Sequence, residues 1–291
     1  MKTWIRKGCC ALALLLLLTG CGQQSAPAEV TLLLPPGTES HSYEPTPADM
    51  LAVQGCDLFI YLGGESDAWV ETILDAVDLQ GTTMRMIDCV ELLEEETVEG
   101  MEEEPGHDDY GLGTVKEYDE HMWTSPANAA KITRDIGEKM GELGPEHQAY
   151  FQSNAEAYAQ QIDAPDDQFA EFFAGVQDKT MLFGDRFPLR YFAAEYDIPY
   201  YAAFPGCSTQ TEPSAATITF LTEKAMEDHL STVYYIEFSN HLVADSIAEA
   251  AGARTALFHT CHNVSQAEMD AGATYVSLME GNLETLRETM H

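Results

Sequence analysis

The sequence predicts an α/β protein with two lobes, each a parallel sheet flanked by helices, joined by one long helix. In both halves of the chain, short apolar runs alternate with stretches of helical periodicity, which is typical of parallel sheets with crossover helices. The 291 residues are enough for two hydrophobic cores. Between the two halves, residues 143–176 have helical spacing, and such a helix spans on the order of 45 Å.

The N-terminus has the pattern of a bacterial lipoprotein signal. A basic segment precedes the apolar residues 9–18, and Leu-Thr-Gly-Cys at 18–21 matches a lipobox. We therefore exclude residues 1–20 from the fold. We expect Cys21 to be lipidated and residues 21–29 to tether the protein to the extracytoplasmic face of the cell membrane. A plain secretory signal or an uncleaved anchor is the alternative.

Composition and charge exclude several classes of protein. Hydrophobic residues make up 45% of the chain, which is typical of a globular protein. No later apolar run is long enough to cross a membrane. The formal net charge of −35 argues against binding to nucleic acid or anionic lipid, and it favours solubility and the attraction of cations.

The first half of the chain predicts the N-terminal lobe, residues 30–142. Ser125 followed by Pro126 has the pattern of a helix start, and the helix should run to about Glu142. The earlier elements follow from apolar runs and helical spacing. We expect strands at 30–34, 57–62 and 83–87, and helices at 48–54 and 65–77.

An acidic loop at residues 91–117 interrupts this alternation. Residues 91–110 contain eight Glu, two Asp and His107, with almost no apolar periodicity. This composition predicts a solvated, flexible loop. Because carboxylates and imidazole bind divalent metals, the same loop can also act as a low-affinity cation collector.

The second half predicts a linking helix and a C-terminal lobe. The linking helix covers residues 143–176, and Pro165 should kink or break it after Asp163. The C-terminal lobe covers residues 177–291 and repeats the alternation of strands and helices. Its strands are expected at 180–183, 200–204, 232–236 and 254–258, and its helices at 189–196, 214–227, 241–251 and 273–290.

Two histidines in loops are the candidate ligands of the N-terminal lobe. His41 lies in the loop at 37–47, which follows the first strand and ends in two prolines that keep the chain irregular. Such a loop at the carboxyl end of a strand can present an imidazole to a ligand. His121 lies just before the helix that starts at Pro126, with acidic residues nearby that can orient its ring.

Polar residues at strand ends are the candidates in the C-terminal lobe. Asp185, Glu237 and His259 each follow an apolar run. The carboxyl ends of parallel strands meet at one edge of a sheet, so these side chains should point into the crevice above it.

Four cysteines remain after the lipobox, and an exported protein can form disulfides. Cys56 and Cys89 lie at opposite ends of parallel strands and should not pair. Cys207 and Cys261 both follow strands of the C-terminal lobe. We therefore expect a disulfide between Cys207 and Cys261, with two free thiols near the cleft as the alternative.

Several motifs, spread over nearly the whole mature chain, resemble one family. The chain resembles the zinc- and manganese-specific solute-binding lipoproteins of bacterial ABC importers. Each motif alone is weak, but their order and spacing together are specific. The motifs lie at 36–49 (around His41), 56–64 (Cys-Asp-Leu-Phe-Ile-Tyr-Leu-Gly-Gly), 120–128 (Glu-His-Met-Trp-x-Ser-Pro-x-Asn), 191–196, 206–214 (Gly-Cys-Ser-x-x-Thr-Glu-Pro-Ser) and 275–283.

The resemblance implies a ligand set with two residues from each lobe. His41 and His121 match the two histidines of the family's N-terminal lobe. The family's third ligand is usually a histidine, but residues 184–186 read Gly-Asp-Arg here. The fourth is usually a carboxylate, and His259 takes its place. We therefore expect Asp185 and His259 to complete the site.

Other C-lobe residues keep this assignment open. Arg186 aligns with the third position as well as Asp185 does and cannot bind a cation. Glu237 is the fallback carboxylate, and His262 is a further neighbour. Three imidazoles and one carboxylate suit Zn²⁺ in a closed tetrahedral site, whereas Mn²⁺ prefers more oxygen ligands.

The expected function is metal capture rather than catalysis. The resemblance implies a monomeric metal-binding protein that delivers its ion to an ABC permease driven by an ATPase. No His-Glu-x-x-His motif or serine elbow suggests a hydrolase. The alternatives are a surface adhesin that buffers metal, and a binder of another metal or a metal chelate, such as iron or manganese.

Overall fold

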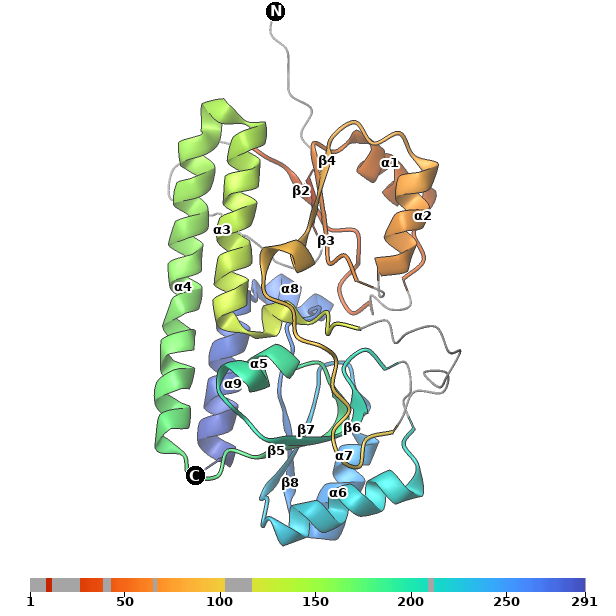
Figure 1. The fold of residues 1–291 in the computed structure, drawn as a ribbon, viewed down its shortest axis with the longest axis vertical. Helices are drawn as coiled ribbons and strands as arrows, with labels where there is room; N and C mark the ends of the chain where they lie inside the picture. Colours follow the sequence, from red (N-terminus) through yellow and green to blue (C-terminus); the bar gives the residue numbers. More distant parts are fainter. Residues whose placement is uncertain are drawn as a thin grey trace, which may run out of the picture. The chain divides into compact units, whose positions relative to one another are not determined.

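The computed structural model describes residues 9–11, 27–38, 43–64, 67–102, 117–208 and 212–290. The chain divides into two compact units, and each contains a four-stranded parallel sheet with helices (Figure 1). Unit 1 comprises residues 1–91, 127–163 and 262–275, and unit 2 comprises residues 92–126, 164–261 and 276–291. Within the described residues, no helix combines the length and apolarity needed to cross a membrane. The predicted α/β class is confirmed.

The sheet of unit 1 has the strand order β2-β1-β3-β4, and all its neighbouring strands are parallel. The first three residues of β3, Leu58, Phe59 and Ile60, are buried because they are apolar or aromatic, and Tyr61 is half-buried. The strands are β1 (Cys9–Ala11), β2 (Val30–Thr31), β3 (Leu58–Tyr61) and β4 (Thr82–Arg85). The helices beside them are α1 (Pro47–Gly55), α2 (Ala68–Ala76) and the short η3 (Met86–Cys89).

The start of this sheet differs from the expectation in two ways. Residues 9–11 pair as β1 between β2 and β3, although we excluded them from the fold. This segment pairs with the edge of β3, whose backbone groups need partners, and the signal peptide at 1–20 stays a prediction. The expected buried strand at 30–34 is also shorter. Only Val30 and Thr31 form β2, and both are exposed, while Leu33 and Leu34 are buried beyond the strand.

A helical hairpin completes unit 1 and continues into unit 2. α3 (Pro126–Leu143) begins at Pro126, as predicted, and η5 (Pro145–His147) leads into α4 (Gln148–Gly175). A Cβ atom at Gly137 would collide with Ala155, so the two helices need a glycine at this close approach. α4 passes through Pro165 without ending, so the expected break does not occur. Fully buried Ile162 and Phe169 hold the helix on both sides of the proline.

The sheet of unit 2 has the order β6-β5-β7-β8, again all parallel. β5 is longer than predicted and contains a register shift between Phe183 and Arg186. The strands are β5 (Met181–Phe187), β6 (Tyr200–Pro205), β7 (Thr232–Tyr235) and β8 (Arg254–Leu257). The helices are α5 (Arg190–Glu195), α6 (Ala215–Glu227), α7 (Leu242–Ala251) and α9 (Tyr275–Thr289); α8 (Gln266–Ala271), which the sequence did not predict, belongs to unit 1.

Aromatic side chains form much of the core of unit 2. Phe192 of α5 is in ring contact with Phe169 of α4 and with Phe258 after β8. Phe183 of β5 stacks on Tyr234 of β7. These contacts place a rigid core directly below the carboxyl ends of the strands, where the candidate site residues lie.

The segment at 92–126 groups with unit 2, whereas the expected boundaries counted it with the first lobe. The Leu93 backbone N–H donates to the Tyr191 hydroxyl of α5, and the Glu102 backbone N–H donates to the Ala203 carbonyl of β6. These two hydrogen bonds attach residues 93–102 to α5 and β6 of unit 2. The domain boundaries at 142 and 177 stay a prediction.

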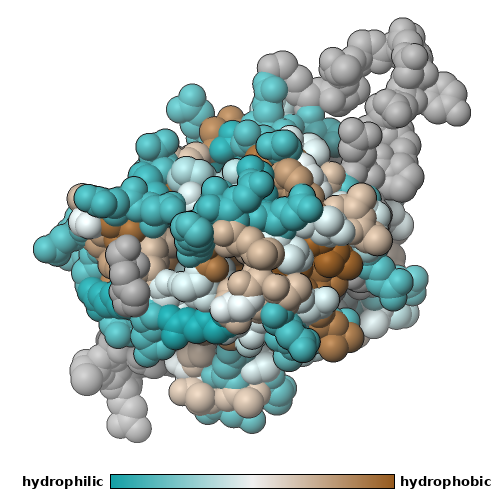
Figure 2. All heavy atoms as spheres, turned by 90° about the horizontal axis from the view of Figure 1, so that it is seen from below, coloured by the Kyte–Doolittle hydropathy of each residue, from teal (hydrophilic) through white to brown (hydrophobic). Residues whose placement is uncertain are grey.

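The surface agrees with the acidic composition. The face in Figure 2 is mainly hydrophilic, with hydrophobic residues between the polar ones. The chain has 49 Asp and Glu against 14 Lys and Arg, so most of its polar surface repels anionic partners.

Candidate metal centre

The turn that carries His121 is buried and rigidly held. His121 is the N-terminal cap of η4 (Met122–Thr124), and the residue is only 1% exposed. Its carbonyl accepts hydrogen bonds from the backbone N–H and the hydroxyl of Thr124. The ring of Trp123 lies 5.4 Å from the imidazole, centroid to centroid. The turn therefore fixes where the imidazole lies.

Asp119 orients the His121 ring in a form that can bind a metal. Its Oδ1 accepts from the His121 backbone N–H at 2.8 Å and lies 3.2 Å from Nδ1 of the ring. A carboxylate accepts, so a His121 ring that donates from Nδ1 to Asp119 has its lone pair on Nε2. Carboxylates oriented in this way are typical partners of metal-binding histidines.

Asp119 is itself held by unit 2. Its backbone N–H donates to the Leu93 carbonyl at 3.0 Å, and its own carbonyl accepts from the Tyr191 hydroxyl at 2.9 Å. Tyr191 belongs to α5, one of the segments that carries the family resemblance. The resemblance at that segment therefore has a physical basis, because α5 helps to position the carboxylate beside His121.

His259 is buried as well, but its ring is arranged differently. Its Nδ1 accepts from the backbone N–H of Cys261 at 2.9 Å. Because that N–H is the donor, the lone pair is on Nδ1 and the proton of the neutral ring is on Nε2. His259 can bind a metal through Nε2 only after this hydrogen bond is lost. The structure thus presents His259 as part of a loop rather than as a ready ligand.

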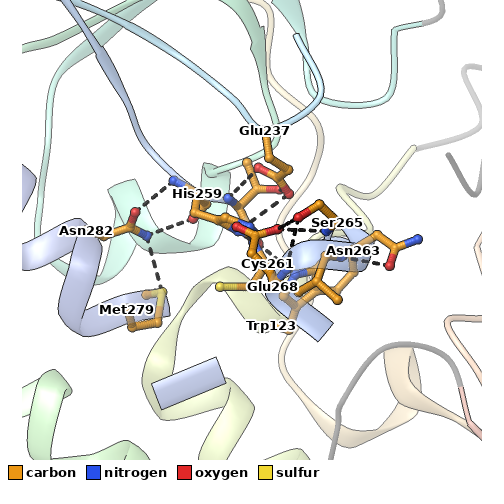
Figure 3. Close-up of polar contacts among 11 residues, drawn as sticks. Trp123, Glu237, His259, Cys261, Asn263, Ser265, Glu268, Met279 and Asn282 are labelled. Carbon is orange, nitrogen blue, oxygen red and sulfur yellow. Dashed lines mark hydrogen bonds and ion pairs between the residues drawn. The ribbon is translucent and has the colours of Figure 1, made fainter. Parts of the chain in front are cut away.

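Glu237 has both carboxylate oxygens engaged. Oε2 accepts from the Thr260 backbone N–H at 2.8 Å, and Oε1 accepts from the Thr260 hydroxyl at 2.6 Å. The nearest ring atom of His259, Nδ1, lies 3.7 Å from Oε1, which is too long for a hydrogen bond. Glu237 therefore joins the end of β7 to the loop after β8 (Figure 3).

Asp185 lies inside β5, at the register shift, and not after the strand as predicted. Burial raises the pKa of its carboxyl group, while hydrogen bonds from Ser239 and the Arg186 backbone act in the opposite direction. The Arg186 N–H donates to Oδ1 at 2.9 Å. A desolvated carboxylate of this kind suits a cation, but this one already accepts hydrogen bonds from Arg186 of β5 and from Ser239 and Ile236 after β7.

The described residues do not bring the predicted ligands together. In that part of the chain, no three His, Cys, Asp or Glu side chains are close enough to hold a metal ion. His41 lies outside the described residues, so the complete predicted set of His41, His121, Asp185 and His259 stays a prediction.

Unit 1 fixes the chain on both sides of His41. The Asn263 amide donates to the Pro35 carbonyl at 3.0 Å and to the Thr38 carbonyl at 2.8 Å. The Gly37 N–H donates to the Val264 carbonyl at 2.8 Å. The sequence did not predict this contact, because Asn263 and Thr38 are 225 positions apart. It brings the segment that begins at His262 beside the loop that leads to His41.

The chain beyond His41 is held by a local network. The Tyr43 hydroxyl donates to Asp49 Oδ2 at 2.7 Å, and the same carboxylate forms a capping box with Thr46 at the start of α1. The ring of Trp69 packs edge-on against Tyr43, with the ring centroids 5.0 Å apart. The Tyr-Glu-Pro-Thr-Pro-x-Asp motif after His41 therefore works as an anchor for the loop.

The predicted Cys207–Cys261 disulfide is not formed, and both residues are free thiols. β6 and β8, which they follow, are the two edges of the sheet. Three strand spacings separate these edges by about 14 Å, whereas disulfide-bonded Cα atoms lie about 4.4–6.8 Å apart. Burial, and then the nearby carboxylates of Asp119 and Glu95, raise the pKa of the Cys207 thiol.

The acidic loop is attached to unit 2 at both described ends. Glu94 and Tyr118 form an antiparallel bridge. Glu102 Oε1 accepts from the Ser214 N–H and the Thr217 hydroxyl at the start of α6, and these bonds lower its pKa. Residues 103–116, with His107, lie outside the described residues. Their role as a cation collector stays a prediction.

Comparison with known proteins agrees with this architecture. Its structural neighbours include two-lobe metal-binding proteins of the ZnuA type. The crystal structure of the Zn(II)-bound ZnuA-like domain of Streptococcus pneumoniae AdcA matches with a TM-score of 0.76 and 26% identity, covering 98% of this chain and 99% of that domain.

The chain belongs to the family described as zinc-uptake complex component A, periplasmic, whose model matches residues 25–289. It is 31% identical over 264 residues, 90% of its length, to the zinc-binding lipoprotein AdcA of Streptococcus pneumoniae. It is 28% identical to the high-affinity zinc uptake system protein ZnuA of Bacillus subtilis, over 90% of this chain and 81% of that protein. The chain spans about half, 51%, of the length of AdcA. The family is described as a component of zinc uptake.

Proposed function

We propose that this chain is an extracytoplasmic lipoprotein that captures Zn²⁺, with Mn²⁺ as the alternative, and delivers it to an ABC permease and its ATPase. The observation that carries the proposal is the buried His121–Asp119 pair in a member of the zinc-uptake family. Cys21 would carry the lipid anchor on the outer face of the cell membrane, and the protein would act as a monomer.

The proposed ligands start with His41 and His121. His121 is supported by its burial and by the Asp119 carboxylate beside Nδ1, which is a typical partner of metal-binding histidines. His41 is supported by the family resemblance and by the anchors on both sides of its loop. Neutral imidazoles are the nitrogen ligands that Zn²⁺ prefers.

The remaining ligands are proposed from β5 itself and from the loop after β8. His259 would have to give up its hydrogen bond from Cys261. His262 is the better histidine candidate, because its neighbour Asn263 bonds to the segment that leads to His41. Asp185 is the carboxylate candidate. Three histidines and one carboxylate then make a closed tetrahedral site, which binds an ion without activating water.

The proposal is tested by metal titration of the full chain purified in detergent. We expect about one Zn²⁺ per chain by elemental analysis and a rise in melting temperature with zinc. His41→Ala and His121→Ala should each abolish that rise. His147→Ala, at an exposed histidine of η5, is the matched control and should keep it. Absence of saturable binding in the wild type, or a retained rise in both ligand variants, contradicts the proposal.

A further inference from the structure

The loop directly after β8, residues 259–261, is buried although it is neither helix nor strand. Buried backbone groups need hydrogen-bond partners, and a loop cannot supply them from a regular ladder. Here side chains supply them. The His259 N–H donates to Asn282 Oδ1, and the Asn282 amide donates back to the His259 carbonyl, both at 2.7 Å. The loop is thereby fixed to α9.

Glu237 and the His259 ring hold the rest of the loop. Glu237 accepts from the backbone N–H and the hydroxyl of Thr260, and Nδ1 of His259 accepts from the Cys261 N–H. Figure 3 shows Asn282 and Glu237 reaching the loop from two different elements. We call the contacts of Glu237 and Asn282 with residues 259–261 the β8 clamp.

Backbone strain occurs at the same place. Cys261 has a φ of 58° and Phe238, directly after Glu237, has a φ of 62°. A left-handed conformation at such residues costs on the order of 1–3 kcal/mol, and it persists only where the surroundings determine it. Both residues lie next to residues of the β8 clamp, Phe238 beside Glu237 and Cys261 beside Thr260.

The β8 clamp also reaches the turn of His121. The Thr260 carbonyl accepts from Nε1 of Trp123 at 2.9 Å. Trp123 is 4% exposed and lies in η4, which His121 caps. A continuous series of buried hydrogen bonds thus runs from Glu237 through Thr260 to Trp123. On the other side of the His121 ring, Asp119 fixes Nδ1.

We propose that Glu237 and Trp123 are positioning residues for His121. Glu237 fixes Thr260, the Thr260 carbonyl fixes the indole, and the indole fixes the turn from which the imidazole reaches the metal. This inference rests on the proposed function, because it names residues that tune the affinity of that same site. Partners of this kind, which orient a ligand without touching the metal, change metal affinity by about 10–100-fold.

Three variants of the full chain test the proposal, and one of them, Glu237→Gln, is the conservative counterpart of Glu237→Ala. Trp123→Phe keeps an aromatic ring but removes the N–H that bonds to Thr260. Glu237→Ala removes both acceptors. Glu237→Gln can still accept from the Thr260 N–H, and it can donate to the Thr260 hydroxyl. We expect the zinc dissociation constant to rise about 10-fold or more in the first two variants and to stay within about 2-fold in Glu237→Gln.

The control and a spectrum separate positioning from general loss of stability. Tyr234→Phe removes a buried hydrogen bond of 2.7 Å to Thr289 in the same unit, so it should lower the melting temperature without changing zinc affinity. The visible absorption of bound Co²⁺ should shift in Trp123→Phe but not in Tyr234→Phe, because the spectrum reports ligand geometry. If Glu237→Ala does not fold, Trp123→Phe and Glu237→Gln still carry the test.

The outcomes distinguish this inference from the proposed function. A wild type that binds neither Zn²⁺ nor Co²⁺ contradicts the proposed function, and this inference with it. A wild type that binds both, with unchanged affinity and spectrum in Trp123→Phe and Glu237→Ala, contradicts this inference alone.

Discussion

Two buried histidines of unit 2 have opposite proton positions. His121 and His259 are 1% and 4% exposed, and both lie in loops that the sequence marks as candidate ligand positions. Asp119 accepts from Nδ1 of His121, whereas the Cys261 N–H donates to Nδ1 of His259. The difference teaches that burial in a loop does not by itself distinguish these two histidines. The partner of Nδ1 does, because it decides which ring nitrogen carries the proton.

The largest effect is expected from one substitution made at both histidines. The amide of asparagine can replace Nδ1 but has no counterpart of Nε2. His121→Asn should therefore keep its contact with Asp119 and lose zinc binding, while His259→Asn should keep its contact with Cys261 and bind zinc normally. At a zinc concentration 100-fold above the dissociation constant, binding stabilises by about 2.7 kcal/mol, a rise in melting temperature of about 5–10 °C.

Thermal melts with and without zinc measure this difference. The roles expected for the two histidines are contradicted if His259→Asn loses the zinc-induced rise in melting temperature while His121→Asn retains it. In that case the loop after β8 supplies the ligand through Nε2 of His259, and the Cys261 bond must open on metal binding.

A smaller effect is expected when the orienting carboxylate is removed. Asp119→Ala leaves Nδ1 of His121 without its acceptor, so the ring loses both its orientation and part of its basicity. The zinc dissociation constant should rise about 10–100-fold. Competition titration with a chelator of known affinity measures the change. An unchanged constant would mean that Asp119 only shapes the turn.

The pH dependence sharpens the same comparison. Protons compete with the metal for the imidazole lone pair, so zinc affinity should fall as the pH decreases through the usual histidine range near 6.5. The zinc-induced rise in melting temperature should therefore shrink between pH 7.5 and about 5. A titration that is flat over this range would argue against histidine ligands.

Local sequence patterns predicted most elements of the fold. Ser125 and Pro126 marked the start of α3, and the apolar alternation located β3, β4 and the four strands of the second sheet. The errors occurred where tertiary structure overrides a local pattern. Pro165 is held inside α4 by its buried neighbours, and residues 9–11 take a place in a sheet that composition alone could not assign.

The candidate site was only partly predictable for the same reason. Asp119 lies two positions before His121, so a close reading of the sequence could have selected it as the orienting carboxylate. Asn263 and Glu237 act across long separations, on Thr38 and Thr260, and no local spacing signals such contacts. The predicted disulfide was wrong because the order of the strands, which separates Cys207 from Cys261, is not visible in the pattern of strands along the chain.

The smallest effect is expected at Asp185, and it tests whether β5 supplies a ligand. Burial raises the pKa of this carboxyl, so the folded protein binds a proton there more readily than the unfolded chain does. Its contribution to stability is therefore most favourable below the unfolded pKa and becomes less favourable as the pH rises through the folded pKa. Asp185→Asn removes the charge and this dependence. The metal-free variant should melt higher than the wild type at pH 7, and the difference should shrink at pH 4.

Zinc affinity of the same variant decides the role of Asp185. If zinc affinity is unchanged, Asp185 does not bind the ion. If zinc affinity falls while the metal-free melting temperature does not rise, Asp185 is a ligand. In that case the substitution weakens zinc binding without stabilising the metal-free fold, as expected for a carboxylate that binds the ion.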